Sequence, residues 1–378
     1  MLQGKSMPSH NEPTAASAGT GLSRRQVLST LAIAAAAPLL SPAAALASKG
    51  PSRGLTEAGG RVNIVIPGNY NPFASISRDA YRIKLTTATL KFVEQGYGGR
   101  NMPIWGKRPD QVDLEKRVYN LAHWVLAGVD QHVGIWPMDP AWVMAQMMAE
   151  SFFYEFAISW AFAVGPCQFI PNTAREYGML VVGDKPEHFA PPFVKTELAP
   201  RYGDYLQVRS KLSDLRKSYA AEGILPPEKA GEKTWRETLR EILDGGTTKA
   251  ERYLEYLEKA ETLNRELDAA RNDFTEYMRA NFEGRDIFRK EDSSYLKRFD
   301  GRVFYREPCS SMVRMLAEGL RARSGNIIAA AASYHAGLSS TRDVGCYEPY
   351  GRLPPIESTV TYVSRILVNH HEIVARMG

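Results

Sequence analysis

The sequence predicts a mainly α fold, and three observations support this prediction. Apolar residues recur at alternating spacings of three and four over several long segments, which is the period of an α-helix. Strand patterns are sparse, and the single convincing one is Val62–Ile66. The 378 residues are 44% hydrophobic and 24% charged, as in ordered globular proteins. We therefore expect one large or two moderate domains built mainly from helices.

Residues 1–47 carry the features of a cleavable export signal. Arg24 and Arg25 stand before an apolar run, Leu28–Leu46, that ends in small residues. Paired arginines at the start of such a run indicate the twin-arginine route. The alternative, a short membrane anchor, is disfavoured because two prolines interrupt the alanine-rich run. We expect a periplasmic protein that begins near Ser48 and is not stably inserted in a membrane.

The charge of the chain and its short motifs limit which classes of partner and cofactor we expect. The 47 basic and 42 acidic residues give a formal charge of +5, and the excess forms no basic stripe, so no nucleic-acid partner is expected. The sequence has no phosphate loop or dinucleotide fingerprint, so no cofactor is expected. His370 and His371 lack the further ligands that a metal site requires, and we expect a solvated helix end there.

The chain has three cysteines, Cys167, Cys309 and Cys346. In an oxidising compartment an odd number leaves at least one free thiol or an intermolecular bridge. A bridge between Cys309 and Cys346 remains open, because the sequence does not give the Cα separation that a disulfide requires.

Helix signals place the main elements in order. After an N-terminal extension over 48–105, which includes the first helix, the predicted helices are Ser77–Gln95, 113–131, 141–156, Ser310–Ala322, Asn326–Ala336 and Ile356–Ala375. Asp139 followed by Pro140 is a strong helix start. The helix that follows is apolar nearly all round, which is typical of a helix at the centre of a domain.

Between these helices, 183–297 differs in character. Two apolar seams recur at heptad spacing, and they consist of Tyr205, Val208, Leu212, Leu215 and Tyr219, and of Tyr253, Tyr256, Ala260, Leu263, Leu267, Ala270, Phe274 and Tyr277. Heptad seams with charged residues between them predict an inserted antiparallel helical hairpin over about 198–290, with a short helix near Trp235–Leu243 in its linker. We expect a separable accessory that could dock a protein partner; two ordinary core helices are the alternative.

Glu150 is the strongest candidate for chemistry. Within 141–156 only Glu150 and Glu155 interrupt the apolar sequence, and five residues place them roughly 140° apart around a helix, so they cannot act together. A carboxyl among methionines and phenylalanines loses hydration when charged, so its pKa should rise and it could deliver a proton near neutral pH. The alternative is a glutamate that faces solvent at a helix end.

The residues around Glu150 resemble a known family, the soluble lytic transglycosylases, whose fold is similar to that of goose-type lysozyme. The matching positions are Glu150-Ser151, Ser159, Ala163, Gly165, Gln168, Pro171 and Thr173-Ala174, then Ala332-Ser333-Tyr334-His335-Ala336-Gly337, then Tyr362-Val363. The resemblance covers 106–182 and 298–378 and implies a lysozyme-like catalytic domain there, interrupted by the hairpin insertion.

The resemblance implies a reaction with one carboxylate. Glycosidases usually need two, with substrate-assisted enzymes as an exception. In this family the glutamic acid protonates the bridging oxygen, the substrate's N-acetyl group stabilises the cation, and the same carboxylate takes the proton of the C6 hydroxyl. We therefore expect a lyase with Glu150 as the single general acid and base, which cleaves the MurNAc–GlcNAc β-1,4 bond of peptidoglycan glycan strands and leaves 1,6-anhydro-MurNAc ends.

The same resemblance implies the substrate-binding residues. Ser159 and Gln168 would position sugar and N-acetyl groups, Gly165 would let the backbone approach the substrate, and Tyr334 would orient Glu150. Ile170 and His335 complete the expected set. The chain departs from the family pattern at Phe162, Pro166, Cys167, His335 and Ser358. The first three predict a stiffer and bulkier loop, and His335, in place of Asn, could titrate near neutrality.

Two other functions remain open from the sequence. A muramidase-type hydrolase on the same fold would need a positioned water and usually a second acid, which the motifs do not show. A peptidoglycan-binding scaffold would act through the hairpin without turnover. The sequence does not distinguish cleavage inside glycan chains from cleavage at their ends.

Overall fold

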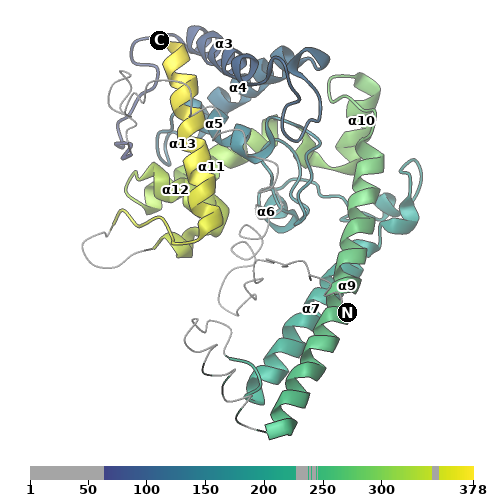
Figure 1. Ribbon diagram of the computed structural model, residues 1–378. Helices are drawn as coiled ribbons and strands as arrows, with labels where there is room; N and C mark the ends of the chain where they lie inside the picture. The colour runs from purple at the N-terminus through teal and green to yellow at the C-terminus, as the bar shows by residue number, and fades with distance from the viewer. Residues whose placement is uncertain (1–63, 227–236, 238–239, 241–243, 245, 343–348) are drawn as a thin grey trace, which may run out of the picture. The chain divides into compact units, whose positions relative to one another are not determined.

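The computed structural model describes residues 64–226, 237, 240, 244, 246–342 and 349–378, and these residues are mainly helical (Figure 1). The predicted mainly α fold is confirmed. The expected strand at Val62–Ile66 is, in its described part, an isolated bridge between Val65 and Asn326. The expected export signal, most of the short linker helix and Cys346 lie outside the described residues.

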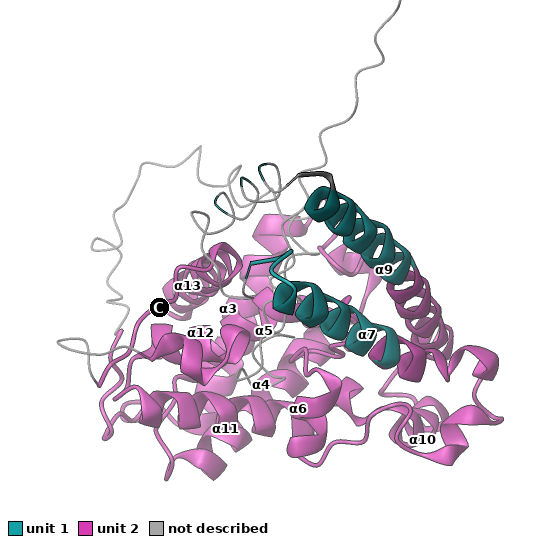
Figure 2. Ribbon diagram, turned by 90° about the horizontal axis from the view of Figure 1, so that it is seen from below, with its two compact units in different colours: residues 1–21, 207–265 teal, residues 22–206, 266–378 magenta. Residues whose placement is uncertain are grey.

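The chain divides into two compact units (Figure 2). Among the described residues, unit 1 comprises those within 207–265, and unit 2 comprises 64–206, 266–342 and 349–378. Both internal boundaries fall inside helices, α7 (Arg201–Ala221) and α9 (Gly246–Phe282). This division differs from the expected one, because parts of 183–297 belong to unit 2.

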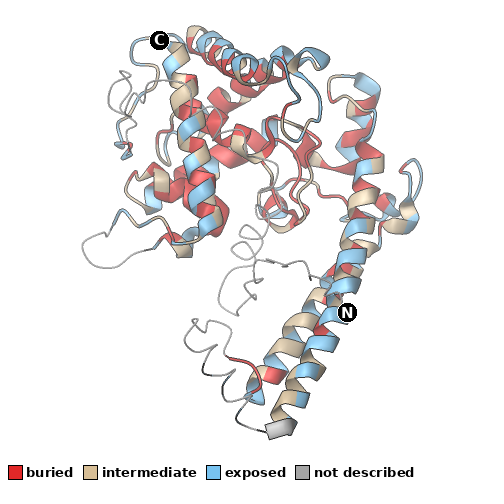
Figure 3. Cartoon of the chain, in the orientation of Figure 1, coloured by how far each residue is buried: buried red, intermediate tan, exposed pale blue. Residues whose placement is uncertain are grey.

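Unit 2 is built around α5, whose side chains are almost all buried (Figure 3). Its helices are α3 (Arg78–Tyr97), α4 (Leu114–His132), α5 (Pro140–Ser151), α6 (Pro171–Glu176), α10 (Lys290–Phe299), α11 (Arg306–Ala322), α12 (Ile327–Ala336) and α13 (Glu357–Met377). α13 and α4 contact α5, α3 contacts α4 and α13, and α11 contacts α4 and α12. The predicted positions of the helices outside 183–297 are confirmed to within a few residues, except at the end of α5.

The confirmed helix starts follow from their N-caps. Asp139 accepts a hydrogen bond from the N–H of Ala141, and Pro140 occupies the first helical position. Ser77 caps α3 and Asn326 caps α12 in the same way. Each cap satisfies N–H groups that have no partner inside the helix, which fixes where the helix begins.

The predicted extent of α5 to Phe156 is wrong, because the helix ends at Ser151. Phe152 and Phe153 adopt positive φ values of 53° and 66°, which turn the chain out of the helix. Both rings are buried. Their burial offsets the cost of the left-handed backbone, which residues other than glycine rarely adopt.

The described part of the N-terminal extension, 64–105, is part of unit 2. Within 48–105, α3 buries Leu85, Ala88 and Val93 in the main core of unit 2. Residues 64–66 bond to the segment before α12 through the pairs Ile66 N to Gly325 O and Ile327 N to Ile64 O.

In unit 1 the end of α7 lies against the start of α9. Tyr219 contacts Tyr256 with ring centroids 5.4 Å apart, and Arg252 pairs with Glu222. Tyr219 precedes Glu222 in the chain, whereas its partner Tyr256 follows Arg252, the partner of Glu222. The two segments therefore run antiparallel. Of the positions predicted to form the seam there, Tyr219 and Ala260 are buried.

The start of α7 and the C-terminal half of α9 belong to the core of unit 2. Tyr205 and, on α9, Phe274, Tyr277, Met278 and Phe282 are buried in its main hydrophobic cluster. The expectation that all of 198–290 can be separated from the rest is therefore wrong. Only 207–265 forms a unit of its own.

Candidate functional site

Glu150 is the penultimate residue of α5 and is half-buried. The hydroxyl of Tyr362, on α13, donates a hydrogen bond of 2.5 Å to its Oε1 atom. Tyr362 is itself buried, with 1% of its surface exposed. The packing of α13 against α5, helped by a bond from Asn369 to the Ala145 carbonyl, thus brings together two residues that are far apart in sequence.

The environment of Glu150 favours a protonated carboxyl. Loss of hydration raises its pKa to about 8, and the hydrogen bond from Tyr362 offsets part of this rise. Among the described residues no cation forms an ion pair with it. The carboxyl therefore holds its proton at neutral pH and can donate it to a basic oxygen.

Glu155, the other carboxylate of the predicted 141–156 helix, lies in the turn that follows α5 rather than on the helix. Its carboxylate accepts bonds from Arg117, with Nη2–Oε1 at 2.8 Å and Nε–Oε1 at 2.9 Å. Burial raises the pKa of Glu155, and the Arg117 guanidinium opposes that rise. A buried carboxylate with such a partner is structural.

The loop that carries the second motif, 157–170, is tied to the end of α5. Ser151 donates to the Pro166 carbonyl over 2.8 Å, and Tyr334 donates to the Cys167 carbonyl over 2.7 Å. The hydroxyl that donates to Glu150 is that of Tyr362, and the expected orientation of Glu150 by Tyr334 stays a prediction. Tyr334 holds the loop.

Ser159 and Gln168 also make bonds within this loop. The Ser159 hydroxyl oxygen accepts from the N–H groups of Ala161 and Ala163, at 3.3 and 3.0 Å. The Gln168 amide donates to the carbonyls of Ala157 and Gly165, at 3.2 and 2.9 Å. Both residues are half-buried. The structure thus gives them a definite role in shaping the loop.

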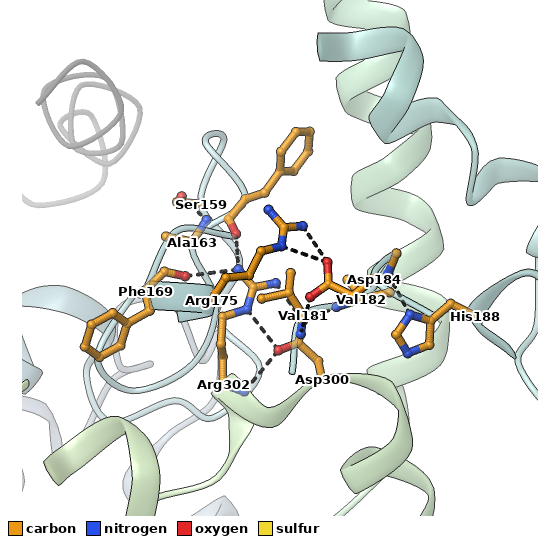
Figure 4. Close-up of polar contacts among 12 residues, drawn as sticks. Ser159, Ala163, Phe169, Arg175, Val181, Val182, Asp184, His188, Asp300 and Arg302 are labelled. Carbon is orange, nitrogen blue, oxygen red and sulfur yellow. Dashed lines mark hydrogen bonds and ion pairs between the residues drawn. The ribbon is translucent and has the colours of Figure 1, made fainter. Parts of the chain in front are cut away.

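A buried arginine supports the loop from below (Figure 4). Arg302 is fully buried, pairs with Asp300 at 2.6 Å, and donates to the carbonyls of Phe162 and Phe169 at 2.7 and 3.0 Å. A charge this deep is stabilised only when each donor has a partner. Because the two carbonyls lie on either side of Gly165, the arginine fixes the width of the turn between them.

Gly165 has φ of +84°, and a Cβ there would lie 2.0 Å from the Arg302 carbonyl oxygen. The structure gives the glycine a reason of its own, the close approach of the Arg302 backbone, and the expected approach to substrate stays a prediction. No other residue fits without a shift of that backbone.

His335 is buried and neutral. Its Nδ1 lies 2.9 Å from the Thr359 hydroxyl, and its ring stacks on Tyr362 with centroids 4.9 Å apart. Burial lowers its pKa to about 3, so the expected titration near neutrality is wrong. His335 instead supports the tyrosine that contacts Glu150.

The remaining predicted residues are apolar. Ile170 is buried in a small cluster with Ala161, Ala163 and Trp160. Phe162 is buried too, and its ring meets Tyr205 and Phe274 edge to face. The bulk of Phe162 therefore points into the core of unit 2. Cys167 is buried and, like Cys309, is a free thiol.

His370 is not the solvated helix end that the sequence suggested. It is 8% exposed, and its Nε2 lies 2.7 Å from the Asp139 carboxylate at the start of α5. In the described part of the chain no three His, Cys, Asp or Glu residues gather as metal ligands would. None of the described helices is both long and apolar enough to cross a membrane.

Sequence reasoning missed Tyr362 as a partner of Glu150. Its place in the Tyr362-Val363 match was a signal, but nothing in the sequence specified which side chain it would meet. Comparisons of the chain with protein-family models, with curated proteins and with solved structures find no match.

Proposed function

We propose that the protein is a peptidoglycan lytic transglycosylase, which cleaves the MurNAc–GlcNAc β-1,4 bond and forms 1,6-anhydro-MurNAc ends. The observation that carries this proposal is the half-buried Glu150, whose only described hydrogen-bond partner is the neutral hydroxyl of Tyr362 and whose pKa burial raises to about 8. A single carboxyl that holds its proton at neutral pH suits a reaction in which one group is first acid and then base.

In the proposed reaction Glu150 gives its proton to the bridging oxygen, and the C1–O bond breaks. The substrate's own N-acetyl group stabilises the developing cation. The Glu150 carboxylate then accepts the proton of the C6 hydroxyl as the C6 oxygen bonds to C1. Between these steps the carboxylate is charged, and the hydroxyl of Tyr362 stabilises it through the hydrogen bond that it already donates.

We also propose the finer fold and the location expected from the sequence: a lysozyme-like catalytic domain in unit 2, an inserted helical hairpin, and export to the periplasm. The antiparallel contacts of α7 and α9 in unit 1 support the hairpin. Deletion of 207–265 with a short flexible linker tests its independence: unit 2 should stay soluble, whereas deletion of 198–290 should cause aggregation because it removes core residues such as Phe274.

The export proposal rests on Arg24 and Arg25. Replacement of both by Lys keeps the charge but removes the guanidinium groups, so periplasmic accumulation should be lost. Unchanged accumulation would point to the general secretory route.

Mass analysis of the products released from purified sacculi tests the reaction itself. Anhydro-MurNAc ends support the proposal, reducing ends would show a muramidase, and no release together with binding to sacculi would show a scaffold. Glu94→Gln is the matched control, because it makes the same chemical change on an exposed face of α3. It should release the same products at the same rate as the unmodified protein.

A further inference from the structure

Three sulfur atoms meet in the interior of unit 2. The thiol of Cys309, on α11, lies 3.9 Å from the thioether sulfur of Met147, on α5. It also forms a side-chain hydrogen bond with the thiol of Cys167, which belongs to the loop 157–170. All three residues are fully buried. Two thiols and a thioether from three separate segments of the chain thus lie side by side.

The spacing of these sulfurs suits one shared metal ion. Three sulfur ligands in a plane around an ion stand about 4 Å apart when each metal–sulfur bond is about 2.3 Å, the length of a zinc–thiolate bond. The sulfurs of Cys309 and Met147 are 3.9 Å apart. This pair therefore already has the separation that a shared ion requires.

The chemistry of the ligands selects the kind of ion. Thiolate and thioether sulfurs are soft ligands that favour Cu(I), whereas magnesium and calcium require oxygen. A structural zinc site takes four ligands from Cys, His, Asp and Glu. In the described part of the chain no His, Asp or Glu joins the two cysteines as a third such ligand. The thioether of Met147 is the third ligand instead, and it favours Cu(I) over zinc.

The charge balance of the buried cluster also favours a monovalent ion, because uncompensated charge is costly where water does not reach. Burial raises the pKa of the Cys167 thiol, so without a metal that thiol keeps its proton. On binding, one of the two thiols releases its proton to the buffer, and its sulfur bonds to the metal. One Cu(I) ion and one thiolate are neutral together, so the cluster is neutral with the metal as well.

We propose that Met147, Cys167 and Cys309 form a binding site for a single Cu(I) ion. The bound ion links α5, the loop 157–170 and α11 through their side chains. The sulfurs are closed from solvent, so the ion enters and leaves when the structure around them opens. The site does not rest on the proposed reaction at Glu150.

Competition with bicinchoninate, a chelator that is coloured when it holds Cu(I), tests the proposal on the full chain under nitrogen with ascorbate as reductant. The background variant is Cys346→Ala, which leaves Cys167 and Cys309 as the only cysteines. We expect each chain to withdraw one Cu(I) ion from the chelator. X-ray absorption at the copper edge should show only sulfur neighbours, at about 2.3 Å. No withdrawal, or nitrogen or oxygen neighbours around the bound ion, would overturn the proposal.

Three variants in this background locate the ligands. Cys167→Ala and Cys309→Ala should each abolish the withdrawal of Cu(I). Met147→Leu nearly keeps the volume of the side chain and should weaken Cu(I) binding about tenfold or more, whereas Met148→Leu, the same change at the next buried position of α5, should not. The thermal midpoint without metal checks that each variant is folded. Equal Cu(I) affinities of Met147→Leu and Met148→Leu would rule out the three-sulfur site.

Discussion

Glu150 and Glu155 are close in sequence and both lie in the protein interior, yet their surroundings differ. Glu150 ends a helix and meets the neutral hydroxyl of Tyr362. Glu155 follows in a turn and meets the guanidinium of Arg117. Burial raises the pKa of both carboxyls, but only Glu155 has a cation that opposes the rise.

The comparison shows that burial alone does not make a carboxyl an acid catalyst. A buried carboxylate with a cation stays charged and holds two segments together, whereas one with a neutral donor keeps its proton. The partner therefore decides which of two similar glutamates serves chemistry and which serves stability. Four predictions test this distinction, from the largest expected effect to the smallest.

Glu150→Gln should abolish the release of anhydro-muropeptides without lowering the thermal midpoint. The amide keeps the shape and can still accept the bond from Tyr362, but it has no proton to give. General acid–base assistance contributes about 10²–10⁴-fold, and more where one residue serves both steps. Release of soluble products from sacculi measures the effect. Activity within about tenfold of the unmodified protein would place the acid elsewhere.

Glu155→Gln should lower the stability of the protein while the proton donor, Glu150, stays in place. It leaves the buried Arg117 without its carboxylate, and breaking a buried pair costs about 3–5 kcal/mol of unfolding free energy. Denaturant unfolding measures the loss. Arg117→Met combined with Glu155→Met should recover most of it, because two apolar side chains leave no unpaired charge. If the double variant were no more stable than Glu155→Gln, the ion pair would not explain the loss.

Tyr362→Phe should lower activity less than Glu150→Gln does, since it removes one hydrogen bond to a charged group, worth about 1.5–3 kcal/mol. That bond lowers the pKa of Glu150, so its loss should raise the pKa further. The alkaline limb of the pH–rate profile should then move to higher pH. A limb that stays in place would show that Tyr362 does not bond to the reacting carboxyl.

The smallest effect concerns stability and pH. The pKa of Glu150 is about 8 in the folded protein against an ordinary value of 4.5 for a glutamate, so the folded state binds the proton more tightly. Its contribution to stability is complete below about pH 4.5 and is lost as the pH rises to about 8. The thermal midpoint of the unmodified protein should therefore fall relative to that of Glu150→Gln over this range. Parallel curves would contradict the raised pKa.

The sequence predicted the starts of the helices well, because the signals are local. Asp139-Pro140 and Asn326 each act on N–H groups two or three residues away. The end of α5 was missed because two phenylalanines in left-handed backbone leave no local signature. Their conformation is set by the core that buries the rings.

The site was predictable to the extent that it depends on residue type. Glu150 stood out as a carboxyl in an apolar segment. Its partner Tyr362 comes from 212 residues further along the chain, and only the packing of two helices brings it there. In the same way, Gly165 was recognised as a special position, but the backbone it accommodates belongs to Arg302.

Two side chains described above make the opening of unit 2 directly measurable. Cys167 and Cys309 are fully buried free thiols, so an alkylating reagent in the surrounding solution can reach them only when the structure around them opens. Their rate of modification therefore reports how often the interior around them, beneath the loop 157–170, becomes exposed to solvent. A ligand that closes over Glu150 should slow that rate, which would reveal binding even where no bond is cleaved.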